Sequence, residues 1–129
     1  MPNPAATRIG DGVPALVLGE RRRAWAGLVM TVRRDDIRRP TDWRIQDDHH
    51  TVVVHLGGHM RRLETELDGF GGSHGPAQPG EVWTVPAGRR YASHAEGTTI
   101  QYVVLRLDPA ALGTPAARQI GRASCRERV

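Results

Sequence analysis

The histidines of this chain are the side chains best suited to hold a metal ion or to transfer protons near neutral pH. There are six of them: His49, His50, His55, His59, His74 and His94. His49 and His50 are adjacent, so on a strand they face opposite sides and do not join in binding one ion. His55 and His59 flank a predicted hairpin turn and could approach each other across it. The spacing of the six matches no zinc signature, so we interpret them as surface and core imidazoles.

The sequence contains no Ser-His-Asp order, P-loop or dinucleotide fingerprint that would indicate another class of enzyme. Its one cysteine, Cys125, lies in a C-terminal segment, 120–129, that is identical to a translated reading frame of a common short-read sequencing adapter. We interpret this segment as non-native and exclude it from the fold, with 113–119 as the start of a linker. No native thiol then remains for catalysis, metal binding or disulfides.

Length and charge exclude several classes of protein. The 129 residues are enough for one domain with a core and too few for two. The formal net charge of +4 falls to +2 without the three arginines and one glutamate of the segment 120–129. A domain this close to neutral lacks the electrostatic footprint of a DNA-binding protein. There is no apolar run of about 18 residues and no signal peptide, so we expect a cytoplasmic protein without membrane contacts.

Short β-rich runs bounded by glycine and proline predict an all-β sandwich or barrel, which must position the side chains above. The predicted strands are 13–18, 24–32, 51–56, 59–67, 82–85, 91–95 and 98–107. Between them, the glycines at 57–58 predict a hairpin and residues 96–97 predict a turn. We expect 1–23 to form a mostly loose N-terminal segment and 33–42 to form a loop. Asp108 followed by proline predicts the start of a helix.

Residues 79–88 form the most distinctive pattern of the chain. Pro79 and Gly80 predict a tight turn before the strand 82–85, and Pro86 and Gly88 predict a second turn after it. The spacing, G-x5-P-x-G, resembles the second conserved motif of the cupin barrel. This resemblance implies a cupin-like double-stranded β-helix, a jelly-roll barrel, over residues 24–112.

Cupin metal sites use three histidines and one glutamate inside the barrel, and this sequence departs from that pattern. When the first motif, G-x5-H-x-H-x3,4-E-x6-G, is anchored at Gly57, its glutamate falls on His50. Its two histidines fall on Trp43 and Ile45, or on Arg44 and Gln46. The histidine of the second motif falls on Tyr91. One imidazole and one phenol do not make a first-row metal site, so we expect no metal and no other cofactor.

The order of features also resembles the N-terminal sensor domain of AraC/XylS-family transcriptional regulators. The matching features are Trp25, the stretches 47–58, 63–69 and 79–88, and the strand 101–107 that leads into Asp108. The resemblance implies a barrel that binds a small-molecule effector and forms a homodimer, ahead of a C-terminal pair of helix-turn-helix units that binds promoter DNA. Those units are not in this sequence, so we expect the chain itself neither to bind DNA nor to be an enzyme.

Four residues are candidates for binding the effector. Tyr91 takes the place of the second motif's histidine, and His50 takes the place of the first motif's glutamate. Trp43 lies where the strand of the first motif would begin, and Trp83 lies in the middle of a barrel strand. Tyr91 and Trp83 could instead serve only in packing. Two alternatives stay open: a small cupin isomerase or dioxygenase with a degenerate metal site, and a stand-alone cupin that acts as an oligomerisation module.

Overall fold

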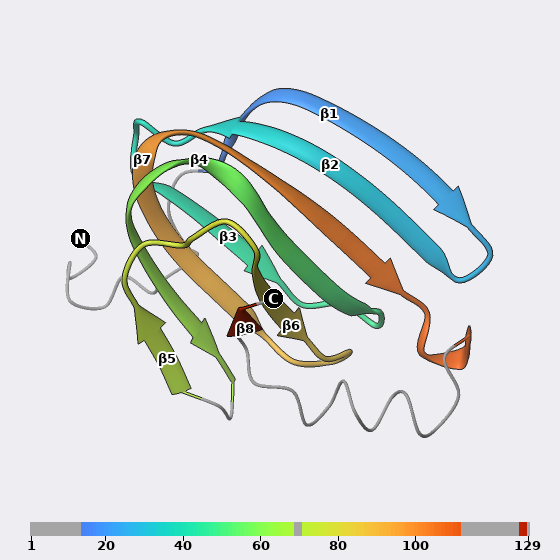
Figure 1. Cartoon of the computed structure of the whole chain (residues 1–129). Coiled ribbons are helices and arrows are strands. Elements are labelled where there is room, and N and C mark those ends of the chain that lie inside the picture. Colours follow the sequence, from blue (N-terminus) through green and yellow to red (C-terminus); the bar gives the residue numbers. More distant parts are fainter. Residues whose placement is uncertain (1–13, 69–70, 112–126, 129) are drawn as a thin grey trace, which may run out of the picture.

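The computed structural model describes residues 14–68, 71–111 and 127–128, which form eight strands and the first turn of a helix (Figure 1). The strands are β1 (Leu16–Trp25), β2 (Leu28–Asp36), β3 (Thr41–Ile45), β4 (His50–Leu67), β5 (Gly71–His74), β6 (Glu81–Val85), β7 (Tyr91–Leu107) and β8 (Glu127–Arg128). This confirms the prediction of an all-β chain. Within these residues, no helix is long and apolar enough to cross a membrane.

Two long strands, β4 and β7, hold the molecule together because each takes part in both of its layers. The second half of β7, residues 99–107, pairs with β2 on one side and with the first half of β4 on the other. The first residues of β7, 91–95, pair with β3 and with the second half of β4. One layer therefore has the strand order β1-β2-β7-β4-β6 and the other β3-β7-β4-β5, and the two appear as facing curved sheets in Figure 1.

Glycines allow β4 and β7 to bend where they pass from one layer to the other. A Cβ on Gly58, which has φ 98°, would lie 2.1 Å from the carbonyl oxygen of Thr99. A Cβ on Gly97 would lie 2.2 Å from a carbonyl oxygen of β4. Side chains cannot be placed where two backbones approach this closely. The predicted hairpin at 57–58 and turn at 96–97 were wrong, because both strands continue through these glycines with shifts in their register.

The N-terminal part also differs from the prediction. β1 pairs with β2 along its whole length, so the strand predicted at 13–18 continues to Trp25 and residues 19–23 are not a loose segment. β2 continues to Asp36, inside the predicted loop 33–42. Its charged sequence suggested a solvated loop, but Asp35 is fully buried and hydrogen-bonded within the protein. Residues 1–13 lie outside the described part of the chain.

The last strand leads into a helix, as predicted. The Asp108 carboxylate accepts a hydrogen bond from the N–H of Ala110 at 3.0 Å, which is the contact of an N-cap residue. Pro109 takes the first helical position, where its missing N–H is not needed. The predicted linker, 113–119, and most of the segment 120–129 lie outside the described residues, while β8 pairs with β6.

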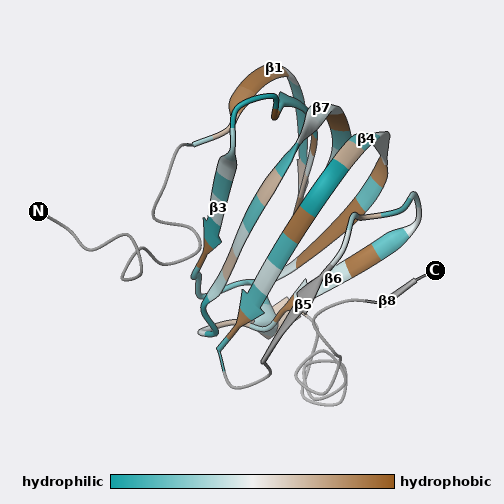
Figure 2. Cartoon of the chain, turned by 90° about the vertical axis from the view of Figure 1, so that its left-hand side faces the viewer, coloured by the Kyte–Doolittle hydropathy of each residue, from teal (hydrophilic) through white to brown (hydrophobic). Residues whose placement is uncertain are grey.

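The core lies between the two layers. Its buried residues are Ile37, Met60, Leu63, Leu67, Ala77, Trp83, Val85, Tyr91, Ala95, Ile100 and Tyr102. Figure 2 shows hydrophobic residues separated by hydrophilic ones in the second half of β4, the pattern of a strand with one buried face. Alternate side chains in this part of β4 therefore point toward the interior between the two layers.

Candidate functional site

A cavity of about 330 Å³ lies between the two layers, within the size range of small-molecule sites. Alternate residues from parts of β4 (51–55) and β7 (91–93 and 100–106) line it, because alternate side chains of a strand share a face. The apolar and aromatic lining residues are Trp43, Ile45, Val53, Met60, Leu63, Trp83, Tyr91, Ile100, Tyr102 and Val104. The polar ones are Arg33, Arg44, Gln46, Asp47, Thr51, His55, Ser93 and Arg106.

A buried network fixes one wall of the cavity. The Tyr102 hydroxyl donates a hydrogen bond to the carboxylate of Asp35 at 2.5 Å. The guanidinium of Arg33 binds the same carboxylate at 3.3 Å and lies 5.7 Å from the centre of the Tyr102 ring. Burial, together with the hydrogen bond to Asp35, raises the pKa of Tyr102 above its ordinary value. The phenol therefore stays protonated and keeps its orientation at any physiological pH.

A second charged group lies beside the cavity. Asp47 receives a hydrogen bond from the guanidinium of Arg106, and its carboxylate also accepts one from the N–H of His49 at 3.1 Å. Burial opposes ionisation of Asp47, but the hydrogen bonds from the His49 N–H and the Arg106 guanidinium, together with the charge of Arg106, outweigh it and lower its pKa to about 2. The Asp48 carboxylate, 2.7 Å from the His49 ring, raises the pKa of that histidine. Asp47 is therefore ionised at neutral and at mildly acidic pH, and it neutralises Arg106.

Two of the lining residues carry polar atoms that are buried in the cavity wall and make no well-formed hydrogen bond among the described residues. They are the hydroxyl of Thr51 and the indole nitrogen of Trp43, which lies near the Tyr102 hydroxyl. A buried polar group without a partner costs about 1–3 kcal/mol.

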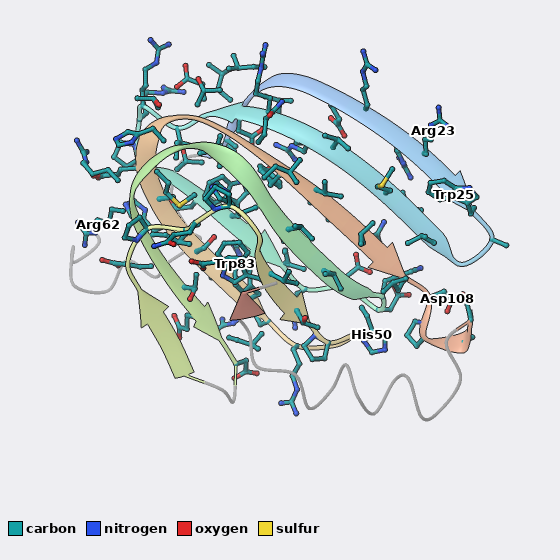
Figure 3. All side chains as sticks on the ribbon, in the orientation of Figure 1. Arg23, Trp25, His50, Arg62, Trp83 and Asp108 are labelled. Atoms are coloured by element: carbon teal, nitrogen blue, oxygen red, sulfur yellow. The ribbon has the colours of Figure 1, made fainter. Side chains whose placement is uncertain are left out.

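The structure brings three of the four candidate residues together. Trp43 from β3, Trp83 from β6 and Tyr91 from β7 all line the cavity. His50 does not: its Nδ1 accepts a hydrogen bond from the N–H of Ala87 at 2.9 Å, and burial lowers its pKa. Figure 3 shows His50 at the start of β4, away from Trp83, which lies between the layers. The ligand-binding role of all four remains a prediction.

The position of His50 has a simple explanation in the register of β4. The first motif was anchored at Gly57, but anchoring it at the next glycine, Gly58, moves the glutamate place to Thr51. Thr51 lines the cavity together with Val53, which is two residues further along the strand. A shift of one residue exchanges the two faces of a strand, so the choice between Gly57 and Gly58 decided whether His50 or Thr51 was predicted to face the cavity.

Sequence reasoning missed other residues of the site. Thr51 and His55 could have been found, since they share one face of the predicted strand 51–56 with Val53. Tyr102 and Asp35 could not, because they are 67 residues apart and their hydrogen bond depends on the pairing of β2 with β7.

The cavity does not contain the donor set of a metal centre. Among its described lining residues, the side chains of metal-binding types are those of Asp47 and His55. A closer group, in which ligand atoms of Asp47, Asp48 and His49 lie within 4.8 Å of one another, is found where Arg106 already binds Asp47. Even an open catalytic site needs about three protein ligands. These residues do not fit a metal held by three histidines and one glutamate.

No protein-family model matches the chain, and no curated protein matches it. Solved structures do. A mannose-6-phosphate isomerase-like protein from Ralstonia eutropha JMP134 superposes with a TM-score of 0.55 at 16% identity, over 82% of this chain and 100% of that one. DMSP lyase DddQ from Ruegeria pomeroyi DSS-3 gives 0.51 at 18% identity, over 65% of this chain and 40% of that one.

A mutant of the oxalate decarboxylase OxdC from Bacillus subtilis gives a TM-score of 0.54 at 13% identity, over 81% of this chain and 28% of that one. The chain thus spans well under half of the lyase and of the decarboxylase. At these identities the likeness concerns the fold, and it shows that the chain has the all-β cupin fold.

The expectation that the chain is not an enzyme is corrected by the same findings. The similar structures include a lyase, an isomerase-like protein and a decarboxylase. That expectation rested on the missing metal ligands and on the regulator resemblance, and nothing in these comparisons supports a regulator specifically. The fold found here is one that enzymes use.

Proposed function

We propose that the barrel binds a small organic molecule with an apolar body and one hydrogen-bond-accepting group, such as a carboxylate. The cavity itself carries this proposal. Ten of its 18 described lining side chains are apolar or aromatic, which suits an apolar body. Three of the others are arginines, whose guanidinium groups donate hydrogen bonds and suit an accepting group.

The charges around the cavity favour an acceptor over a cation. Arg33, Arg44 and Arg106 line it, against the single lining carboxylate of Asp47 in the described part of the chain. Asp35 binds Arg33 and Asp47 binds Arg106, which balances part of this positive charge. A carboxylate would therefore enter a weakly positive environment, whereas an ammonium group would be repelled.

Isothermal titration calorimetry with phenylacetate and with 2-phenylethanol tests this proposal, because the two share an apolar body and differ in the carboxylate. We expect phenylacetate to bind more tightly. We expect Arg44→Gln, which removes a lining positive charge, to weaken the binding of phenylacetate about five- to tenfold. Arg34→Gln, the same change at an exposed arginine of β2 that does not line the cavity, is the matched control. Equal binding of phenylacetate by the wild type and the Arg44 variant would contradict the proposal.

We further propose that this binding serves transcriptional regulation, as the effector-binding and dimerisation domain of an AraC-type protein. The order of motifs supports it, as does the helix that Asp108 caps where such a regulator would continue into its linker. Long-read sequencing of the gene across codon 119 is the test. Two helix-turn-helix units after a linker helix would support a regulator, and a frame that closes within a few codons would contradict it.

The second candidate is a cupin enzyme that acts on the bound molecule. The enzymes among the similar structures favour it, and the cavity holds groups that exchange protons, namely Tyr91, His55 and Asp47. NMR of a bound compound over time would reveal conversion. If Tyr91→Phe abolished conversion and kept binding, the chain would be an enzyme.

A further inference from the structure

The edge strand β1 exposes large apolar side chains to solvent. Leu16, Val17, Leu18 and Trp25 are 51%, 42%, 45% and 52% exposed. β1 pairs with β2 along one side, and within the described residues nothing pairs with its other side (Figure 1). A ten-residue strand with a free edge and exposed apolar residues is a template for another strand.

The pairing with β2 determines which side chains of β1 share a face. Glu20 pairs with Arg33, which lines the cavity, so Glu20 belongs to the inner face. A bulge between Val17 and Gly19 takes up one extra residue, Leu18. The inner face therefore has Val17, Glu20, Arg22 and Ala24. The outer face has Leu16, Gly19, Arg21, Arg23 and Trp25; Figure 3 shows Arg23 and Trp25 near the end of the strand.

The sequence of β1 is complementary to itself when two copies pair antiparallel over their full length. With the bulge counted, Leu16 of one copy then lies opposite Trp25 of the other, on the outer face. Glu20 of one copy lies opposite Arg22 of the other, on the inner face. Each pair occurs twice, and opposed residues share a face, as an antiparallel ladder requires. Arg21 meets its own copy at the centre and has Arg23 of the other copy as a diagonal neighbour, and these are the unfavourable contacts.

Other registers lose this complementarity. Moving the centre of the pairing one residue toward the start of β1 puts Glu20 opposite Glu20. Moving it one residue toward the end puts Arg22 opposite Arg22 and Arg21 opposite Arg23. Either shift also separates Leu16 from Trp25. Full overlap of the strand is thus the register that pairs opposite charges and joins the exposed apolar residues.

We propose that β1 is a homodimer interface, in which two copies of the chain pair antiparallel along this strand. The occupant of the free edge is a second copy because the strand complements its own charges. This inference is independent of the ligand in the cavity.

Neutralising the three adjacent arginines of β1 one at a time gives the most specific test. In sedimentation-velocity measurements of the full chain over a range of concentrations, we expect a dimer. Arg22→Thr loses the contact with Glu20 and should raise the dimer dissociation constant about fivefold. Arg21→Thr removes the central repulsion and should lower it by a similar factor. Arg23→Thr faces a glycine and lies only diagonal to Arg21 of the second copy, so it should lower the dissociation constant less than Arg21→Thr does. Equal effects from all three would overturn the proposed register.

Charge reversal provides a rescue. Glu20→Arg and Arg22→Glu each oppose like charges twice, and each variant alone should dissociate at least tenfold more readily. In an equal mixture of the two variants, every opposed pair is again opposite in charge, so a heterodimer should form. Melting curves check that each variant is folded, which is expected because both side chains are exposed. A wild-type chain that is monomeric at all concentrations, or a mixture that stays monomeric, would overturn the proposal.

A cysteine pair gives a direct second measurement in a Cys125→Ser background. Leu16 and Trp25 are at opposite ends of one strand, so a disulfide between them within a chain cannot form. Mixing a Leu16→Cys chain with a Trp25→Cys chain should give a cross-linked heterodimer under mild oxidation, and neither chain alone should give one in comparable yield. Equal cross-linking of the separate chains would contradict the register.

Discussion

β1 and β7 belong to the same sheet, and they differ most in how many strands they pair with and in how exposed their residues are. β7 pairs with β2, β3 and β4, and its alternate residues line the cavity. β1 pairs with β2 alone, and nearly all of its residues are exposed. The fold and the proposed ligand site therefore depend on β7 and its neighbour β4. The side chains of β1 are mostly exposed and bury little surface in the monomer, so its sequence can instead specify a contact with another molecule.

The largest effect is expected where β4 crosses β7. Gly58→Ala would force a Cβ against the Thr99 carbonyl oxygen and would strain a positive φ, so we expect it to cost about 3 kcal/mol or more of the free energy of unfolding. Gly57→Ala is the matched control, because nothing lies within 4 Å of its Cβ position. Urea unfolding measures both. Similar losses for the two variants would mean that the crossing does not depend on a single glycine.

A smaller effect is expected where β7 contacts β2. Tyr102→Phe removes the hydroxyl that donates to the buried Asp35 carboxylate, and we expect a loss of about 1–3 kcal/mol in the same urea experiment. Adding Asp35→Asn should recover part of that loss, since no buried charge would then lack this donor. If Tyr102→Phe were neutral, Arg33 alone would be sufficient to hold Asp35.

The smallest effect is expected at the end of β7, where His50 pairs with Leu107. Burial lowers the pKa of His50, so the unfolded chain takes up its proton at a higher pH than the folded chain. The contribution of His50 to stability is complete above the ordinary histidine pKa, near 6.5, and is lost as the pH falls below it. Urea unfolding at pH 7 and pH 5 should show this loss. His50→Asn, which keeps an acceptor for the Ala87 N–H, should reduce it.

His49 is the natural control for that pH dependence, since its pKa is raised rather than lowered. Its contribution is present at low pH and is lost as the pH rises past the histidine range, so His49→Asn should steepen the loss of stability on acidification. The same change from both variants would show that the pH dependence arises elsewhere.

Much of the fold was predictable from local sequence. The positive φ of Gly80 (88°) and Gly88 (81°) agrees with the turns predicted around the strand 82–85, and Asp108 caps its helix as expected. The glycines at 57–58 were misread because a glycine pair suits a hairpin and a bulged bend equally well. What decides between them is the approach of Thr99, about 40 residues away, which no local pattern contains.

The candidate site was predictable only in part, again because some of its contacts join residues that are far apart in the sequence. Spacing alone placed Tyr91 and Trp83 on barrel strands, and both line the cavity. His50 was placed on the wrong face by a one-residue ambiguity. The network of Tyr102 with Asp35 required knowledge of which strands pair, and that is a property of the whole chain.

The sharing of β4 and β7 between both layers also has a consequence for how the chain folds. Neither layer can be completed before the other begins, because each needs half of the same two strands. Their ladder joins residues about 24 to 57 positions apart in the sequence, and such non-local pairing makes folding slow. The domain should therefore appear in refolding experiments as a single cooperative phase on the millisecond-to-second scale, with no stable half-barrel along the way.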